Sequence, residues 1–133
     1  MITIWHQMIK ERNISQLNSI LSENIVLHSP IVHTPLEGRK IVSRYLTAAF
    51  HTFLNDSFHY VREVIAESTA VLEFTVELDG VFVNGVDMIS WNKDGKIVDF
   101  KVMIRPLKAV NLIHQKMGAM LEKLEQNQAL SFQ

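Results

Sequence analysis

Residues 81–106 read VFVNGVDMISWNKDGKIVDFKVMIRP, and they contain two long apolar stretches separated by the dipeptide Asp94-Gly95. This arrangement indicates a β-hairpin, because a two-residue type I′ turn needs positive φ at both central positions and Asp-Gly tolerates it. We therefore predict two antiparallel strands, 82–92 and 96–104, joined at this turn.

The turn also predicts which residues of the two strands lie opposite each other, because it pairs Lys93 with Lys96. On one face of the hairpin this register places the pairs Asp87–Val102, Ile89–Phe100 and Trp91–Val98. On the other face it places the pairs Met88–Lys101 and Ser90–Asp99. A one-residue shift would move every side chain to the opposite face, so the clean division into an apolar and a polar face supports this register.

Asp87 is the one acidic residue on the predicted apolar face. Burying a carboxylate is costly unless it has a partner or a task. Because no cationic residue lies beside it in this register, burial disfavours the charged form, and we expect a raised pKa. Two interpretations follow. Asp87 is a catalytic or ligand-binding acid, or it is a structural residue that hydrogen-bonds a backbone amide or a water at the rim of the sheet.

The rest of the chain alternates between helical and extended patterns. Apolar residues at helical spacing predict helices at 4–12, 17–21, 39–53 and 107–125. Alternating or short apolar runs predict further strands at 25–28, 58–66 and 69–78, with a loop at 31–38. Residues 126–133 are expected to fray. Consecutive strands with short connections form an antiparallel meander, and helices that precede it cover one of its faces, so we predict an α+β fold.

The size and composition are those of one globular domain that spans residues 1–133. Hydrophobic residues make up 47% of the chain and charged residues 20%, which excludes a disordered protein. The formal net charge is −1, so neither a nucleic acid nor an anionic membrane surface is expected as a partner. The chain has no cysteine, which excludes thiol catalysis, disulfides and cysteine-ligated metals.

The start of the chain lacks the sequence pattern of a signal peptide. Residues 1–13 contain no basic segment followed by an apolar core, so we expect no signal peptide. No apolar run approaches the length that crosses a membrane. A cytoplasmic protein is therefore expected.

Taken in order, these features resemble the nuclear transport factor 2-like superfamily, which includes ketosteroid isomerases and SnoaL-like proteins. The resemblance runs from Trp5 to about Ile104 and depends on order and spacing rather than on a single motif. The features that carry it are a helix with a polar break at Asn13, the loop from Ser29-Pro30 to Gly38, the strand with Phe74-Thr75-Val76, and the hairpin from Val86-Asp87-Met88 to Asp94-Gly95-Lys96-Ile97. It implies a conical barrel, in which a strongly curved antiparallel sheet wraps around the N-terminal helices and a pocket lies inside, followed here by a C-terminal helix.

The resemblance also implies roles for three residues. Asp87 falls where ketosteroid isomerases keep a protonated aspartate that donates to an oxyanion. Trp5 falls where those enzymes carry the oxyanion-hole tyrosine, and its indole N–H can also donate. Ser29 falls where they carry the general-base aspartate, but a hydroxyl does not abstract protons near neutral pH without activation. Because Trp5 and Ser29 depart from the pattern, steroid isomerase activity is not expected.

Strand parity and the resemblance together predict a mostly apolar pocket beside Asp87. The residues expected to line or cap it are Trp5, Ser29, Leu46, Phe74, Val76, Ile89, Trp91, Phe100, Val102 and Ile104. His33 lies on the loop that flanks the mouth of this pocket. It is either a further acid or base near pH 7 or a solvated loop residue.

The histidines do not predict a metal site. His28 and His33 lie on either side of a Ser-Pro turn, and no pair of histidines shows the i, i+4 helical spacing or the i, i+2 strand spacing typical of metal ligands. We therefore expect no metal and no cofactor.

Three functions remain open on the sequence alone. The first is binding of a small apolar molecule with one polar group near Asp87. The second is an isomerase, dehydratase or cyclase that uses Asp87 as acid, with help from Trp5 and His33. The third is a non-catalytic interaction module, whose cone is filled by Trp5, Trp91 and Phe100. An empty cavity of some hundreds of Å³ with a polar tip favours the first two, and a cone plugged by these three side chains favours the third.

A homodimer through the outer face of the sheet is also expected. The outward residues of the meander combine methionines with charges of both signs. Glu73 or Glu77 of one chain can therefore meet Lys101 or Arg105 of its partner. Dimers through sheet faces are also common in the resembled family.

Overall fold

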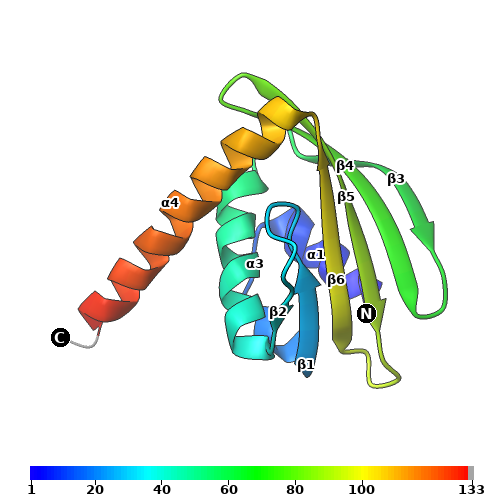
Figure 1. Ribbon diagram of the computed structural model, residues 1–133. Helices are drawn as coiled ribbons and strands as arrows, with labels where there is room; N and C mark the ends of the chain where they lie inside the picture. The colour runs from blue at the N-terminus through cyan, green and yellow to red at the C-terminus, as the bar shows by residue number, and fades with distance from the viewer. Residues whose placement is uncertain (132–133) are drawn as a thin grey trace.

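A strongly curved sheet of six strands wraps around the helices in the computed structural model, which describes residues 1–131 and the side chains of residues 1–127 (Figure 1). The elements in chain order are α1 (Ile2–Glu11), α2 (Leu17–Ile20), β1 (Leu21–His28), β2 (Leu36–Glu37), α3 (Arg39–Phe53), β3 (His59–Ile65), β4 (Thr69–Leu78), β5 (Val81–Trp91), β6 (Ile97–Arg105) and α4 (Leu107–Ser131). The predicted α+β class and the curved sheet are confirmed.

The strand order across the sheet is β2-β1-β6-β5-β4-β3. The last four strands in the chain, β3 to β6, form the predicted antiparallel meander. β1 pairs with β6 in parallel and with β2 in antiparallel fashion, and neither pairing was predicted. The strand expected at 25–28 is longer than predicted, and the segment expected as a loop at 31–38 contains β2.

The loop between β5 and β6 differs from the predicted two-residue turn. Of Asp94 and Gly95, only Gly95 has a positive φ, at 74°. The backbone N–H of Asn92 instead donates to the carbonyl of Lys96 around a three-residue loop. Oδ1 of Asn92 accepts hydrogen bonds from the backbone N–H groups of Asp94 and Lys96, and these bonds close the loop. The expected pairing of Lys93 with Lys96 is therefore wrong.

A β-bulge next to this loop restores the predicted register. Val98 is the extra residue, so Trp91 lies opposite Ile97 rather than opposite Val98. Beyond the bulge the pairs are as predicted: Asp87–Val102, Met88–Lys101, Ile89–Phe100 and Ser90–Asp99. Asp87 therefore lies on the inner face of the sheet, where it is 8% exposed.

Two clusters of buried side chains fill the inner side of the sheet. The first joins α1 and α3 to the middle of the sheet and includes Trp5 and Phe100. The second joins α3 and α4 to β4 and β5 and includes Phe74, Val76 and Ile113. Because α3 contributes buried side chains to both clusters, it connects them on the concave side of the sheet.

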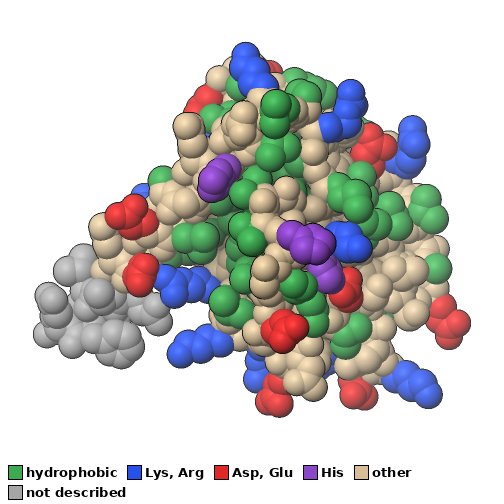
Figure 2. All heavy atoms as spheres, in the orientation of Figure 1, with side chains coloured by type: hydrophobic (Ala, Val, Ile, Leu, Met, Phe, Trp, Pro, Cys, Tyr) green, Lys and Arg blue, Asp and Glu red, His purple; other side chains and the backbone are tan. Residues whose placement is uncertain are grey.

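The C-terminal helix is longer than expected. It continues to Ser131, so residues 126–131 are helical rather than frayed, and residues 132–133 lie outside the described residues. Its buried residues Ala109, Ile113 and Met117 recur every four positions and anchor one face of the helix to the domain, while its far end extends away from the sheet (Figure 1). No helix in the described part of the chain is both long enough and apolar enough to span a membrane. Acidic and basic side chains are interspersed on the face shown in Figure 2.

Gly85 is expected to tolerate substitution poorly. A Cβ added there would lie 2.3 Å from Cζ of Phe74, so Gly85→Ala should lower the free energy of unfolding by about 1–3 kcal/mol through overpacking. Gly118 on α4 has open space around it, so Gly118→Ala should raise that free energy by about 0.5–1 kcal/mol. Urea unfolding of both variants checks these opposite signs, and a stabilised Gly85→Ala would contradict the packing described.

Candidate functional site

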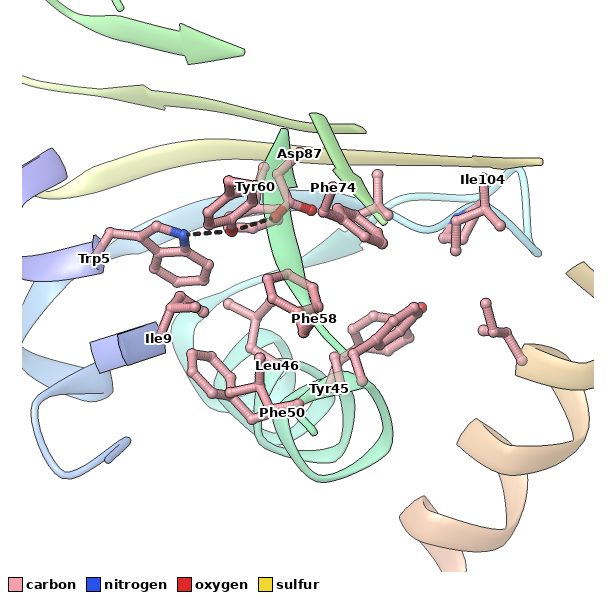
Figure 3. Close-up of a pocket in the computed structure, with 17 residues that line it drawn as sticks. Trp5, Ile9, Tyr45, Leu46, Phe50, Phe58, Tyr60, Phe74, Asp87 and Ile104 are labelled. Carbon is pink, nitrogen blue, oxygen red and sulfur yellow. Dashed lines mark hydrogen bonds between the residues drawn. The ribbon is translucent and has the colours of Figure 1, made fainter. Parts of the chain in front are cut away.

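The inner side of the sheet encloses a cavity next to Asp87 (Figure 3). Its walls come from α1, α3 and the four strands of the meander, with Pro30 from the β1–β2 loop and Ile113 from α4. The lining is mostly aromatic and aliphatic, and Asp87 is the only charged residue among the described residues that form it. The cavity volume is about 60 Å³, which is the space that the centres of water-sized molecules can occupy.

Trp5, Tyr60 and Asp87 form a chain of hydrogen bonds along one wall of the cavity. Nε1 of Trp5 donates to the hydroxyl of Tyr60 at 3.0 Å, and this hydroxyl donates to Oδ2 of Asp87 at 2.8 Å (Figure 3). The direction is fixed because an indole N–H only donates, so the Tyr60 oxygen accepts from Trp5 and offers its own proton to Asp87. The other carboxyl oxygen, Oδ1, receives no hydrogen bond from the described residues.

Burial raises the pKa of Asp87 from 3.8 to about 7. Desolvation of the carboxylate is the cause, and the hydrogen bond from Tyr60 offsets part of it by favouring the charged form. Burial, together with the nearby Asp87 charge, raises the pKa of Tyr60 well above 10.0. Tyr60 is therefore a neutral donor at physiological pH, whereas Asp87 populates both its acid and its carboxylate form.

Strand pairing explains why Asp87 lacks a cationic partner. On the inner face it lies between Leu72 of β4 and Val102 of β6, both of which are apolar. Tyr60 belongs to β3, two strands away, where it pairs with Phe74. Its long side chain brings a hydroxyl to Asp87 across β4, and Trp5 approaches the same hydroxyl from α1.

The structure brings together only part of the predicted pocket. The predicted residues that line the cavity with Asp87 are Trp5, Leu46, Phe74, Phe100, Val102 and Ile104. Three others do not line it: Val76 packs in the second cluster near α4, Ile89 is fully buried in the first cluster, and Trp91 is half-buried at the loop end of β5. Strand parity gives the face of a side chain but not its height along the cone, so it does not decide whether these three border the cavity.

Ser29 and His33 do not line the inner cavity either. Oγ of Ser29 accepts hydrogen bonds from the backbone N–H of Ile31 at 3.0 Å and from the hydroxyl of Tyr45 at 3.3 Å. Both Ser29 and His33 line a second pocket, which opens on the outer side of the β1–β2 loop. Ser29 therefore lies beside the inner cavity rather than on its lining, next to Pro30 and hydrogen-bonded to Tyr45, both of which line it.

Sequence reasoning missed the functional place of both tyrosines. Tyr60 was expected only as part of a strand and Tyr45 only as part of the apolar stripe of a helix. A buried tyrosine hydroxyl usually has a hydrogen-bond partner, so an aromatic residue with a polar tip inside an apolar pattern was the available signal. Burial raises the pKa of Tyr45, and its bond to Ser29 lowers it in part, so Tyr45 is a second neutral hydroxyl on the cavity wall.

Among the described side chains, those of residues 1–127, no three histidine, aspartate or glutamate groups lie close enough together to hold a metal ion. The polar side-chain groups at the cavity include the carboxyl of Asp87, the hydroxyls of Tyr45 and Tyr60 and the indole of Trp5.

Comparisons with known proteins give one family match and several structural matches. The model of the SnoaL-like domain family matches residues 2–100. A structure described as a steroid delta-isomerase from Pseudomonas aeruginosa is 33% identical, with a TM-score of 0.88 over 94% of this chain and 91% of that chain. An uncharacterised protein with a cystatin-like fold from Silicibacter pomeroyi is 27% identical, with a TM-score of 0.77 over 85% of this chain and 79% of that chain.

A more distant match shows the fold alone. An epoxide hydrolase/cyclase-like enzyme with a role in pyran ring formation in salinomycin is 15% identical, with a TM-score of 0.62 over 78% of this chain and 87% of that chain. No curated protein matches the sequence.

Proposed function

The chain belongs to the SnoaL-like domain family, within the nuclear transport factor 2-like superfamily, and on this basis we propose that its inner cavity binds a small, mostly apolar molecule with one hydrogen-bonding group. One observation carries the proposal: Asp87 borders an apolar cavity while its Oδ1 has no partner among the described residues. A buried acid with an unused oxygen is costly to the fold, and such groups gather at functional sites.

The hydrogen-bond chain decides how Asp87 meets a ligand. Because Tyr60 already donates to Oδ2, a proton taken up by Asp87 is best placed on Oδ1. In its acid form Asp87 therefore donates to a ligand carbonyl, hydroxyl or ether oxygen, and in its carboxylate form it accepts from a ligand hydroxyl or amine. The polar group of the ligand is accordingly expected to contact Oδ1.

The size of the cavity favours a ligand with a single ring or a short branched chain. A volume of 60 Å³ on this measure holds about four to six water molecules or an organic fragment of similar bulk. Trp5 and Phe100 pack against each other, with ring centroids 5.2 Å apart, yet space remains beside them. This space is below the hundreds of Å³ typical of ligand pockets, so a ligand confined to it must be small.

Binding of 4-methylcyclohexanone, followed by the amide shifts of the protein in NMR, tests this proposal. Its ring matches the cavity and its ketone accepts from the acid form of Asp87. We expect binding to the wild type and a loss of at least tenfold in Ala49→Phe, because Ala49 lines the cavity and a ring there would fill it. Ala119→Phe, on an exposed position of α4, should bind normally. Equal binding to Ala49→Phe would contradict the proposal.

A second candidate function is an enzyme that moves a proton with Asp87, as an isomerase, dehydratase or cyclase does. Two observations favour it: the pKa near 7, and the 33% identity to a protein described as a steroid delta-isomerase. The carboxylate can take a proton from one atom of a substrate and return it to another, so one group balances the transfer. Exchange of the α-hydrogens of 4-methylcyclohexanone in heavy water measures this activity. Asp87→Asn should abolish any exchange above the rate in buffer.

We also propose that the protein is a homodimer through the outer face of its sheet. An apolar row crosses this face, with Val64, Val71 and Met88 aligned on neighbouring strands, and Met103 lies in the next row at 53% exposure. Glu73 of β4 and Arg105 of β6 lie on the same face outside this row, so two copies related by a two-fold axis can pair opposite charges.

Met103→Glu is expected to convert this dimer into a monomer, because the substitution adds a charge beside the apolar row, within the proposed contact. Light scattering on the pure proteins measures the change. Leu107→Glu, at a 75% exposed position at the start of α4 and off the sheet face, is the matched control and should leave the dimer intact. A monomeric wild type, or a dimer indifferent to Met103→Glu, would contradict this interface.

A further inference from the structure

A second pocket opens beside β6 at the point where β1 ends. It is lined by the β1–β2 loop, by His28 and by residues 101–104 of β6, and its volume is about 360 Å³ on the same measure. β1 pairs with β6 only as far as His28 and Lys101. Among the described residues, no strand covers residues 102–105 of β6 on that side, so loop residues rather than a strand border the pocket.

Three described residues border both this outer pocket and the inner cavity, namely Pro30, Val102 and Ile104. Pro30 belongs to the β1–β2 loop and pairs with no strand. The two pockets are therefore adjacent compartments at the uncovered end of β6.

The outer pocket is basic where the inner one is apolar. Lys101 and His33 line it, and neither takes part in an ion pair among the described side chains, whereas His28 pairs with Asp99 at 3.0 Å. None of the described residues that line the pocket has a carboxylate side chain. Figure 2 shows histidine side chains beside a basic side chain over the β1–β2 loop and β6, next to hydrophobic surface. This combination suits an anionic group attached to an apolar body.

We propose that the two compartments form one binding site and that its ligand is a small organic carboxylate. The apolar body of this ligand fills the inner cavity with an oxygen at Asp87, and its carboxylate reaches Lys101 and His33 at the mouth. The ligand must extend from β5 past the edge of β6, which is two strand spacings, or about 10 Å. This inference rests on the proposed function and adds the charge and the length of the ligand.

Two probes of matched shape test the inference by calorimetry. One is 3-(4-oxocyclohexyl)propanoate, which has a ketone and a carboxylate at opposite ends of an apolar ring, and the other is its neutral methyl ester. We expect the wild type to bind the acid about fivefold or more tightly than the ester. Lys101→Met should remove this preference by weakening the acid alone, while Lys93→Met, at the exposed tip of the hairpin, should keep it.

Two further variants complete the design. His33→Gln should weaken binding of the acid and leave binding of the ester unchanged, because His33 lines the outer pocket. His33→Gln also tests the carboxylate contact independently if Lys101→Met alters the oligomeric state, which light scattering measures. Ala49→Phe should remove binding of both probes, because the acid needs the inner cavity as well as the mouth.

The outcomes separate this inference from the proposed function. Equal affinity for acid and ester would contradict the claim that the ligand is a carboxylate, and so would an acid preference that survives both Lys101→Met and His33→Gln. Either result would leave binding in the inner cavity unaffected. Acid binding that persists in Ala49→Phe shows a site at the surface only, and it too overturns the inference. Failure of both probes to bind the wild type counts against the proposed function, and the inference falls with it.

Discussion

Asp87→Asn is expected to stabilise the protein by up to about 4 kcal/mol at pH 8 and to leave its stability nearly unchanged at pH 4. The pKa of Asp87 is raised from 3.8 to about 7 on folding, and this shift corresponds to about 4 kcal/mol. Well below pH 3.8 the carboxyl is protonated in both states and contributes nothing, and at pH 4 its contribution is still small because ionisation of the unfolded chain has only begun. As the pH rises from 4 to 7, the unfolded chain gives up the proton first, and the wild type loses stability; above 7 the loss is complete.

Urea unfolding of the wild type and of Asp87→Asn between pH 4 and pH 8 measures this difference. Asparagine keeps the shape of the side chain and an oxygen that accepts from Tyr60, so the fold should persist. Asp94→Asn makes the same change at an exposed position of the hairpin loop and should not alter the slope. A stability difference between Asp87→Asn and the wild type that is independent of pH would show that Asp87 is not a buried, uncompensated acid.

Trp5→Ala is expected to lower the free energy of unfolding by about 3–5 kcal/mol, the range for removing a large buried aromatic side chain. Trp5 is 2% exposed, and its ring packs against Phe50 and Phe100 with centroids 5.5 and 5.2 Å away. The substitution also removes the indole N–H that donates to Tyr60. The loss therefore combines a cavity in the core with a broken hydrogen-bond chain.

Two companion variants separate these effects. Trp5→Phe keeps most of the apolar contact and removes only the donor, so it should cost about 1–2 kcal/mol. Trp91→Ala truncates a half-buried tryptophan at the loop end of β5, away from the cavity, and should cost less than Trp5→Ala. Urea unfolding at one pH compares all three. A loss in Trp5→Ala no larger than that in Trp91→Ala would contradict the central place of Trp5 in the core.

The face on which Asp87 lies could be predicted from the sequence because a strand alternates strictly between two faces. Two errors at the hairpin cancelled: the loop is one residue longer than predicted, and the bulge at Val98 compensates. The type I′ geometry expected at Asp94-Gly95 occurs instead at Asp79-Gly80, where both φ values are positive, 51° and 78°. Side-chain hydrogen bonds from Asn92 decide the conformation of the longer loop, and turn propensities do not contain them.

The members of the site could be predicted only in part. Alternation predicts that Val76 and Ile89 face inward, as they do, but the curvature of the sheet and the packing of α3 and α4 decide which inward residues border empty space. The place of Tyr60 beside Asp87 depends on the pairing of β3 with β4, and this pairing contains a register shift next to Tyr60. The parallel pairing of β1 with β6, which leaves the end of β6 uncovered, joins residues far apart in the chain, and no local pattern signals it.

The most direct test of the central claim, that Asp87 presents an acid to a ligand in the inner cavity, is a carbon-13 NMR titration of its carboxyl group with and without saturating 4-methylcyclohexanone. We predict a pKa of about 7 for the free protein. The pKa should be higher in the complex, because the ketone accepts a hydrogen bond from the acid form only. A carboxyl that titrates near 3.8, or one whose pKa is the same with and without the ketone, would contradict the claim.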